Sequence, residues 1–176
     1  LNISGTGAMK DYNSNDNLSP AYMNWNVKKI VIEEDVTTIG NSAFDSCMNL
    51  TSVTIPNSVT CIEIAAFAYC KNLTSITIPD NVTSIGNAAF MECSNLTSIT
   101  IPGSVTSIGI DAFYGCTSLT NITIPDSVTN IGAAVFENCS SLKTISLSCK
   151  SSLKKSDFGK QADLVSYNHK NEITHD

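Results

Sequence analysis

Apolar and polar residues recur along this chain with a fixed period of 23 residues. Each period opens with a short alternation of apolar and polar residues, as at residues 76–78. Pro79 ends this alternation, because proline has no N–H group to donate to a sheet. A second β-branched segment follows at residues 82–85 and ends at Gly86. The period-two pattern predicts two short strands in each period.

The second half of each period has a different spacing. Ala89, Phe90 and Cys93 are apolar and lie at helical spacing, which predicts one helical or 3₁₀ turn over residues 87–93. This phenylalanine and cysteine recur in five consecutive periods, and a leucine follows each cysteine after three residues. The cysteines are Cys47, Cys70, Cys93, Cys116 and Cys139, and the phenylalanines are Phe44, Phe67, Phe90, Phe113 and Phe136.

One such unit is too small to bury its own apolar side chains. Stacked units cover one another, so the repeat predicts a solenoid with a continuous core. Strands of neighbouring units would then lie parallel, in register and about 4.8 Å apart. The equal length of the units enforces this register, because a slip of one residue turns inward side chains outward.

Segments without the repeat are expected to cap both ends of the solenoid. Residues 1–27 fit an N-terminal cap, in which Ile3 and Met9 cover the first coil. The aromatic residues expected to pack nearby are Tyr12, Tyr22 and Trp25. Because the chain begins at Leu1 and not at methionine, we expect it to come from a longer protein whose signal peptide has been removed.

The repeats are predicted to occupy residues 28–147, as about five 23-residue units. Beyond Leu147 the pattern fails, since the proline position becomes Ser148. Residues 148–176 are therefore predicted to form a C-terminal cap and a tail, with a last strand at residues 164–167.

Four full copies align on the cysteine and give the consensus LxxIxIPxxVxxIGxxAFxxCxx. With IP, VTSIG and AFxxC at 23-residue spacing, this consensus resembles the BspA-like leucine-rich repeat family over residues 30–147. Departures are few, such as Glu63 in place of the glycine. The resemblance implies a repeat solenoid, a right-handed leucine-rich-repeat α/β superhelix with 23-residue repeats, short parallel strands and little helix.

Members of that family are typically cell-surface or secreted proteins of host-associated bacteria and of some protozoan parasites. The resemblance therefore implies an extracellular or cell-surface location and a non-catalytic role in adhesion or protein binding. The implied partner is a host extracellular matrix or cell-surface protein, or the surface protein of another microbe. The family shares no catalytic motif, so no functional residue carries over. We expect the chain to be a monomer.

Composition narrows the choice of partner. Charged residues make up 15% of the chain, and the net charge is −6. Binding to a nucleic-acid backbone needs clustered basic side chains, so we expect no nucleic-acid partner. The lysines near the two ends are Lys28, Lys29, Lys143, Lys150, Lys154 and Lys155. No apolar run is long enough to span a membrane, so we expect no membrane insertion of this chain.

Three roles are open to the five repeated cysteines. Metal sites use CxxC pairs or Cys/His clusters, whereas here every spacing is 23 and the repeat has no histidine. Stacked neighbours lie within disulfide range, but their parallel Cβ vectors do not point at one another. We therefore expect buried apolar residues, with no metal and no cofactor. Cys61 is expected to be partly exposed and unpaired, and Cys149 to be a free thiol in the cap.

No catalytic residue is predicted. His169 and His175 lie in the tail, and no serine or cysteine is framed by a GxSxG motif or by a nearby His/Asp pair. The acidic run at residues 33–35 is expected to be a solvated edge. The sequence therefore favours a protein that is not an enzyme.

The strand surface offers a first candidate binding site. Its hydroxyl ladder consists of Thr54, Thr77, Thr100 and Thr123, beside a second ladder of Ser52, Ser75, Ser98 and Asn121. In leucine-rich repeats this face is the usual binding surface. However, these residues hardly vary between copies, and threonine ladders also stabilise parallel strands. Protein-binding faces instead use aromatic and arginine anchors.

The residues just before the cysteines offer a second candidate site, because they vary most between copies. Tyr69, Met91 and Tyr114 are expected to line up on one side of the solenoid. A row of exposed aromatic and methionine side chains resembles an interaction patch. The alternative is that they are separate exposed apolar residues, which are common on any protein.

Three functions stay open. The first is an extracellular binding or adhesion module, which the row of Tyr69, Met91 and Tyr114 favours. The second is a stiff structural spacer that presents another domain, which the uniform hydroxyl face favours. The third is a glycan-binding module, which would need aromatic side chains paired with carboxylates or amides in a groove that the sequence does not place.

Overall fold

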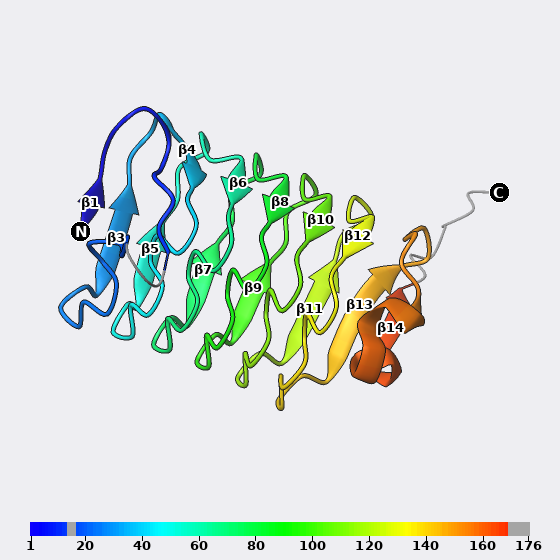
Figure 1. The fold of residues 1–176 in the computed structure, drawn as a ribbon. Coiled ribbons are helices and arrows are strands. Elements are labelled where there is room, and N and C mark those ends of the chain that lie inside the picture. Colours follow the sequence, from blue (N-terminus) through cyan, green and yellow to red (C-terminus); the bar gives the residue numbers. More distant parts are fainter. Residues whose placement is uncertain (14–16, 169–176) are drawn as a thin grey trace.

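Each 23-residue period forms one coil, and the coils stack into a solenoid of parallel strands (Figure 1). The computed structural model describes residues 1–13 and 17–168. One column of strands comprises β1 (Asn2–Ile3), β3 (Lys29–Ile32), β5 (Ser52–Thr54), β7 (Ser75–Thr77), β9 (Ser98–Thr100), β11 (Asn121–Ile124), β13 (Thr144–Ser148) and β14 (Val165–Asn168). The other comprises β2 (Gly7–Ala8), β4 (Val36–Ile39), β6 (Cys61–Ile62), β8 (Ser84–Ile85), β10 (Ser107–Ile108) and β12 (Asn130–Ile131).

The predicted register is confirmed. Strand β7 pairs with β9 so that Ser75, Ile76 and Thr77 lie beside the residues 23 positions later in the chain. The second column forms one continuous six-stranded ladder from β12 to β2. Like residues therefore stack on like residues along the solenoid, with isoleucines facing inward and hydroxyls outward.

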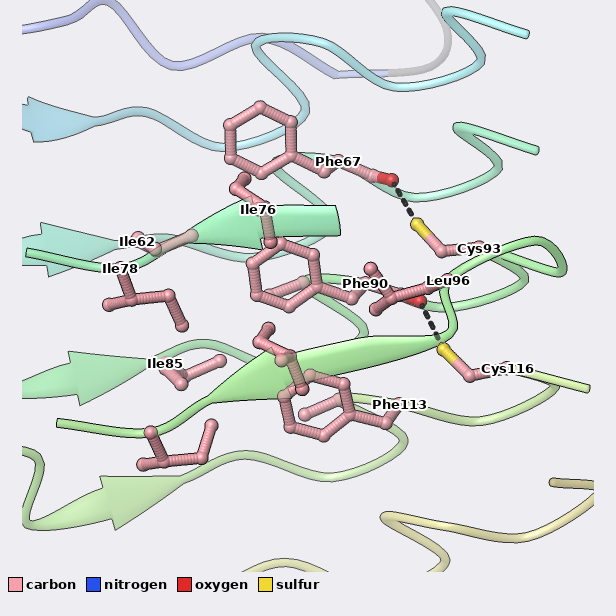
Figure 2. Packing of buried hydrophobic residues seen from close by; sticks show 14 of the residues in the cluster. Ile62, Phe67, Ile76, Ile78, Ile85, Phe90, Cys93, Leu96, Phe113 and Cys116 are labelled. Carbon is pink, nitrogen blue, oxygen red and sulfur yellow. Dashed lines mark hydrogen bonds between the residues drawn. The ribbon is translucent and has the colours of Figure 1, made fainter. Parts of the chain in front are cut away.

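Stacked phenylalanine rings form the centre of the core (Figure 2). The ring centroids of successive repeats lie 5.4–5.6 Å apart, from Phe44 to Phe136. The planes of Phe67, Phe90 and Phe113 differ by only 3–5°. Such offset stacking adds to the burial of the rings themselves. The 23-residue spacing therefore builds one aromatic column along the axis of the solenoid.

The helical turn predicted over residues 87–93 is wrong. These residues form consecutive turns, in which Ala88 and Glu92 have positive φ angles of 53° and 57°. The N–H groups of Ala88, Phe90 and Glu92 point along the solenoid and donate to carbonyls of the next coil, at 2.7–2.8 Å. A helix would direct these N–H groups back into its own segment, so bonding between coils overrides the helical spacing.

The N-terminal segment covers the first coil as Ile3 and Met9 were expected to do, and Tyr12 also packs against the core. Tyr22 is half-buried. The packing predicted for Trp25 is wrong, because its side chain is 56% exposed. Ala21 and Val27 supply buried apolar side chains of this segment. Trp25 contributes through its backbone carbonyl, which accepts a hydrogen bond from the Asn49 side chain.

The C-terminal segment closes the other end. A 3₁₀ helix, η1 (Lys155–Leu164), breaks its regular geometry at Gly159, where φ is 52°, and places Phe158 against Phe136. It is the one helix among residues 1–13 and 17–168. The last strand predicted at residues 164–167 is present as β14 one residue later, because Leu164 ends helix η1, and it pairs in parallel with β13. The tail predicted beyond residue 168 lies outside the described residues.

Candidate functional site

The strand face carries the predicted hydroxyl ladder. Thr54, Thr77, Thr100 and Thr123 are all exposed on strands β5, β7, β9 and β11. Thr77 lies directly beside Thr100, and Thr123 beside Ser146. None of these four hydroxyls has a hydrogen-bond partner among the described residues. The face therefore carries a row of exposed hydroxyl groups that make no hydrogen bond to the described part of the chain.

Other threonines of the repeat bond to the preceding coil instead of facing solvent. The sequence alone did not distinguish these threonines from those of the strand face. The hydroxyls of Thr60, Thr83 and Thr106 donate to backbone carbonyls exactly one repeat earlier, at 3.2 Å. Thr51 and Thr97 make the same bond on the other side of the coil. These threonines hold neighbouring coils together, so their hydroxyl groups have a structural role.

The structure brings Tyr69, Met91 and Tyr114 to the same side of the solenoid, on the segments between the second strand column and the cysteines. The Tyr69 N–H donates to the carbonyl of Met91 at 2.7 Å, which makes these residues neighbours on adjacent coils. Met91 and Tyr114 occupy equivalent positions two residues before their cysteines. Tyr69 is 36% exposed, and the other two are half-buried.

Two further apolar residues belong to this side and were missed from sequence. Ile64 and Ile110 are 48% and 50% exposed and lie on the same turn segments. At the equivalent position the alternating coils have Asn41 and Asn87, whose side-chain carbonyls accept the N–H groups of Ile64 and Ile110 at 2.8–2.9 Å. The replacement of a hydrogen-bonding asparagine by isoleucine in every second coil is the signal that could have identified them.

We call Ile64, Tyr69, Met91, Ile110 and Tyr114 the turn-face patch. Carboxylates adjoin it. The Glu92 carboxylate lies over Gly115, where an added Cβ would come within 2.5 Å of its Oε1. The patch is therefore apolar with an acidic border, in a chain of net charge −6.

At the C-terminal side of the patch the side chains are held in place. The Tyr114 hydroxyl accepts a hydrogen bond from the Asn138 amide at 2.5 Å. Lys160 of helix η1 forms an ion pair with Glu137. The hydrogen bond to Glu137 and the charge of that carboxylate raise the pKa of the Lys160 ammonium. The hydroxyl of Tyr114 is therefore held by the last coil, whereas the hydroxyl of Tyr69 makes no hydrogen bond among the described residues.

The cysteine column is buried, as expected, and has a role beyond filling space. The thiols of Cys93 and Cys116 donate to the carbonyls of Phe67 and Phe90 in the preceding coil, both at 3.2 Å (Figure 2). All seven cysteines are free. Cys61 is half-buried and Cys149 exposed, which confirms both expectations.

Burial raises the pKa of every thiol in the column, to about 12 for Cys47 and about 11 for Cys139. Only the thiolate is a good nucleophile, so these thiols are inert at neutral pH. We expect iodoacetamide to label Cys61 and Cys149 in the folded chain, and all seven cysteines in urea. Intact-mass measurement and peptide mapping check this, and rapid labelling of the fully buried Cys93 in the folded chain would contradict it.

The described residues hold no group of three or more His, Cys, Asp or Glu side chains placed to bind a metal ion. His169 and His175, which were not predicted to be catalytic, lie outside the described residues. In the part of the chain that the structure describes, no helix has the length and apolar character needed to cross a membrane.

Sequence comparison places the repeat in a known group. The family model of the BspA type leucine-rich repeat region matches six copies, over residues 19–143 and 62–175. No curated protein matches the chain.

Solved structures share the fold. The leucine-rich repeat protein TpLRR of T. pallidum aligns with a TM-score of 0.70 and 25% identity, over 82% of this chain and 72% of that protein. A leucine-rich cell surface protein of Faecalibacterium prausnitzii aligns with a TM-score of 0.58 and 28% identity, over 86% of this chain and 50% of that protein. The pneumococcal vaccine antigen PcpA, at 21% identity and a TM-score of 0.62, shares the fold over 82% of this chain and 36% of its own length.

Proposed function

Because the chain belongs to the BspA-type leucine-rich repeat family, we propose that it is a non-catalytic binding module of an extracellular or cell-surface protein. The description of its F. prausnitzii neighbour as a cell surface protein supports this location. Leucine-rich repeats of this family are generally without catalytic activity. The module binds a host matrix or cell-surface protein, or a surface protein of another microbe, and it does so as a monomer.

The turn-face patch carries the proposal. Ile64 and Ile110 expose about half of their side chains, and Tyr69 shares the turn segment of Ile64 while Met91 lies in the coil between the two isoleucines. Large aliphatic and aromatic side chains clustered on a rigid surface are typical of protein interfaces. The exposed side chains of strands β7 and β9 are serine and threonine, which rarely dominate binding energy.

The surroundings of the patch indicate the chemistry of its partner. Glu92 places a carboxylate beside the apolar residues, and the chain has a net charge of −6. A partner surface with exposed apolar residues bordered by lysine or arginine complements this arrangement. Binding should therefore weaken as salt is added, since the border charges are screened.

Replacement of Ile64 and Ile110 by asparagine tests the patch. The neighbouring coils already have asparagine at this position, as Asn41 and Asn87. Ile64→Asn and Ile110→Asn should therefore keep the fold. We expect the double variant to bind a partner from a panel of immobilised extracellular matrix proteins at least about tenfold more weakly, because two interface anchors of about 1 kcal/mol each are lost. Surface plasmon resonance measures the change.

The matched control is the pair Thr77→Val and Thr100→Val on the strand face, which should leave the affinity unchanged. If this control loses binding while the isoleucine variant keeps it, the strand face is the binding surface. Saturable binding on a parallel glycan panel would favour the glycan-binding alternative. A folded chain that binds neither panel would favour the structural spacer.

A further inference from the structure

The most exposed residues of the turn-face patch recur with a period of two coils. Ile64 and Ile110 occupy equivalent positions two repeats apart, and about half of each side chain is exposed. Tyr69 and Tyr114 lie in the same two coils. In the coil between them the equivalent residue is Asn87, whose side-chain carbonyl accepts the Ile110 N–H at 2.8 Å. Two apolar bands are therefore separated by one intervening coil.

The stacked rings beneath the patch measure the spacing of these coils. Phe67, Phe90 and Phe113 lie in the three coils concerned, and the planes of successive rings differ by only 3–5° (Figure 2). Because the rings are equivalent and nearly parallel, the separation of their centroids gives the advance from one coil to the next beneath this face. That advance is 5.4–5.6 Å.

The spacing of the coils matches the pitch of an α-helix, which is about 5.4 Å. A helix laid along the solenoid axis therefore advances by one turn for each coil. Its side chains at i, i+3 or i+4, and i+7 share one face and meet the coils of Ile64, Met91 and Ile110 in turn. An extended strand repeats its side chains about every 6.6 Å on one face and falls out of step with the coils. The spacing therefore selects a helical partner.

The turn segments of these three coils are acidic. From the glycine position to the cysteine they contain Glu63, Glu92 and Asp111 and no basic residue, and Lys71 follows the first segment. Lysine or arginine side chains on the flank of a helix complement this charge. A second copy of the chain would instead bring two acidic surfaces together, so charge favours a basic helix over self-association.

We propose that the turn-face patch binds an amphipathic α-helix that lies along the solenoid axis, with one helical turn over each coil. Apolar side chains at i, i+3 or i+4, and i+7 contact the coils of Ile64, Met91 and Ile110, at the anchor spacing by which proteins recognise such helices. Basic side chains on the flank of the helix face Glu92. This inference rests on the proposed function, because it names the kind of segment that the patch recognises in its protein partner.

Three synthetic peptides of about 18 residues, or five helical turns, test this inference. The first has leucines at helical spacing on one face and lysines and alanines elsewhere. The second has the same composition with leucine at every second residue of its central part, and the third is the first with a central proline, which breaks the helix. By fluorescence anisotropy we expect saturable binding of the first peptide, and binding of the other two at least about tenfold more weakly.

Variants of the chain locate the contact. The double variant Ile64→Asn and Ile110→Asn should bind the first peptide at least about tenfold more weakly. Glu92→Gln should weaken binding about two- to fivefold and reduce its dependence on salt, because one attractive charge is lost. The control pair Thr77→Val and Thr100→Val on the strand face should bind the peptide like the unchanged chain.

Absence of saturable binding of the helical peptide, or equal binding of all three peptides, would overturn the proposal. If a protein of the matrix panel binds through Ile64 and Ile110 while no peptide binds, the proposed function stands and the helical partner is wrong. Sedimentation of the unchanged chain provides a further check. Dimers that are lost in the double isoleucine variant would show that a second copy covers the patch, and they would also overturn the proposal.

Discussion

Phe90→Ala is expected to lower the free energy of unfolding by about 3–5 kcal/mol, the largest effect of any single side chain considered. Phe90 is fully buried and lies between two rings, with centroids 5.6 Å from Phe67 and 5.4 Å from Phe113. Its removal takes away stacking on both faces and leaves a cavity that the backbone cannot close, because hydrogen bonds between coils fix the spacing of the turns. Urea unfolding followed by circular dichroism measures the loss.

Phe158→Ala provides the comparison. Phe158 has a ring neighbour on one face only, at the longer centroid distance of 6.4 Å, and it lies in the C-terminal cap. Its removal should therefore cost clearly less than that of Phe90. Equal losses for the two variants would show that the column does not act as a stack of mutually supporting rings.

Gly109→Ala should be destabilising by about 1–3 kcal/mol, although it adds a single methyl group. A Cβ at Gly109 would lie 2.5 Å from the backbone nitrogen of Asn87 and 2.6 Å from the carbonyl carbon of Gly86. The neighbouring coil approaches too closely for a side chain at this position. Because Glu63 occupies the equivalent position of another coil, the backbone can shift to some extent, and we expect strain and not loss of the fold.

Gly103→Ala is the matched control in the same coil. No atom lies within 4 Å of a Cβ added there, so this substitution should be neutral or slightly stabilising. The two unfolding midpoints in urea give the comparison. A loss of stability in Gly103→Ala as large as in Gly109→Ala would contradict the close approach of the coils.

The strand columns and the core could be predicted from sequence because they follow from one constraint. A fixed 23-residue unit whose isoleucine, phenylalanine and cysteine side chains point inward can stack in one register only. The pairing of Ile76 with Ile99 confirms that register. The helical turn over residues 87–93 could not be predicted correctly, since side-chain spacing does not reveal where N–H groups point. The hydrogen bond from the Phe90 N–H group to the Ala112 carbonyl, in the next coil, keeps that segment from forming a helix.

The candidate site was predicted in part. Variation between copies identified Tyr69, Met91 and Tyr114, and the structure places them on one side of the solenoid. Ile64 and Ile110 were missed because variation between copies was sought only in the residues just before the cysteines. Ala21 was assigned to a cap, but its backbone already belongs to the repeat, because its carbonyl accepts the hydrogen bond of the Cys47 thiol.

Hydroxyl-radical footprinting of the chain, free and bound to a partner identified on the protein panel, tests the proposed binding surface most directly. Tyrosine and methionine side chains are readily oxidised, so Tyr69, Met91 and Tyr114 report on the patch themselves. Binding through the patch predicts strong protection of these three residues in the complex, and unchanged oxidation of the exposed Trp25, outside the patch. Unchanged oxidation of all three residues at saturating partner would show that the turn-face patch is not the binding surface.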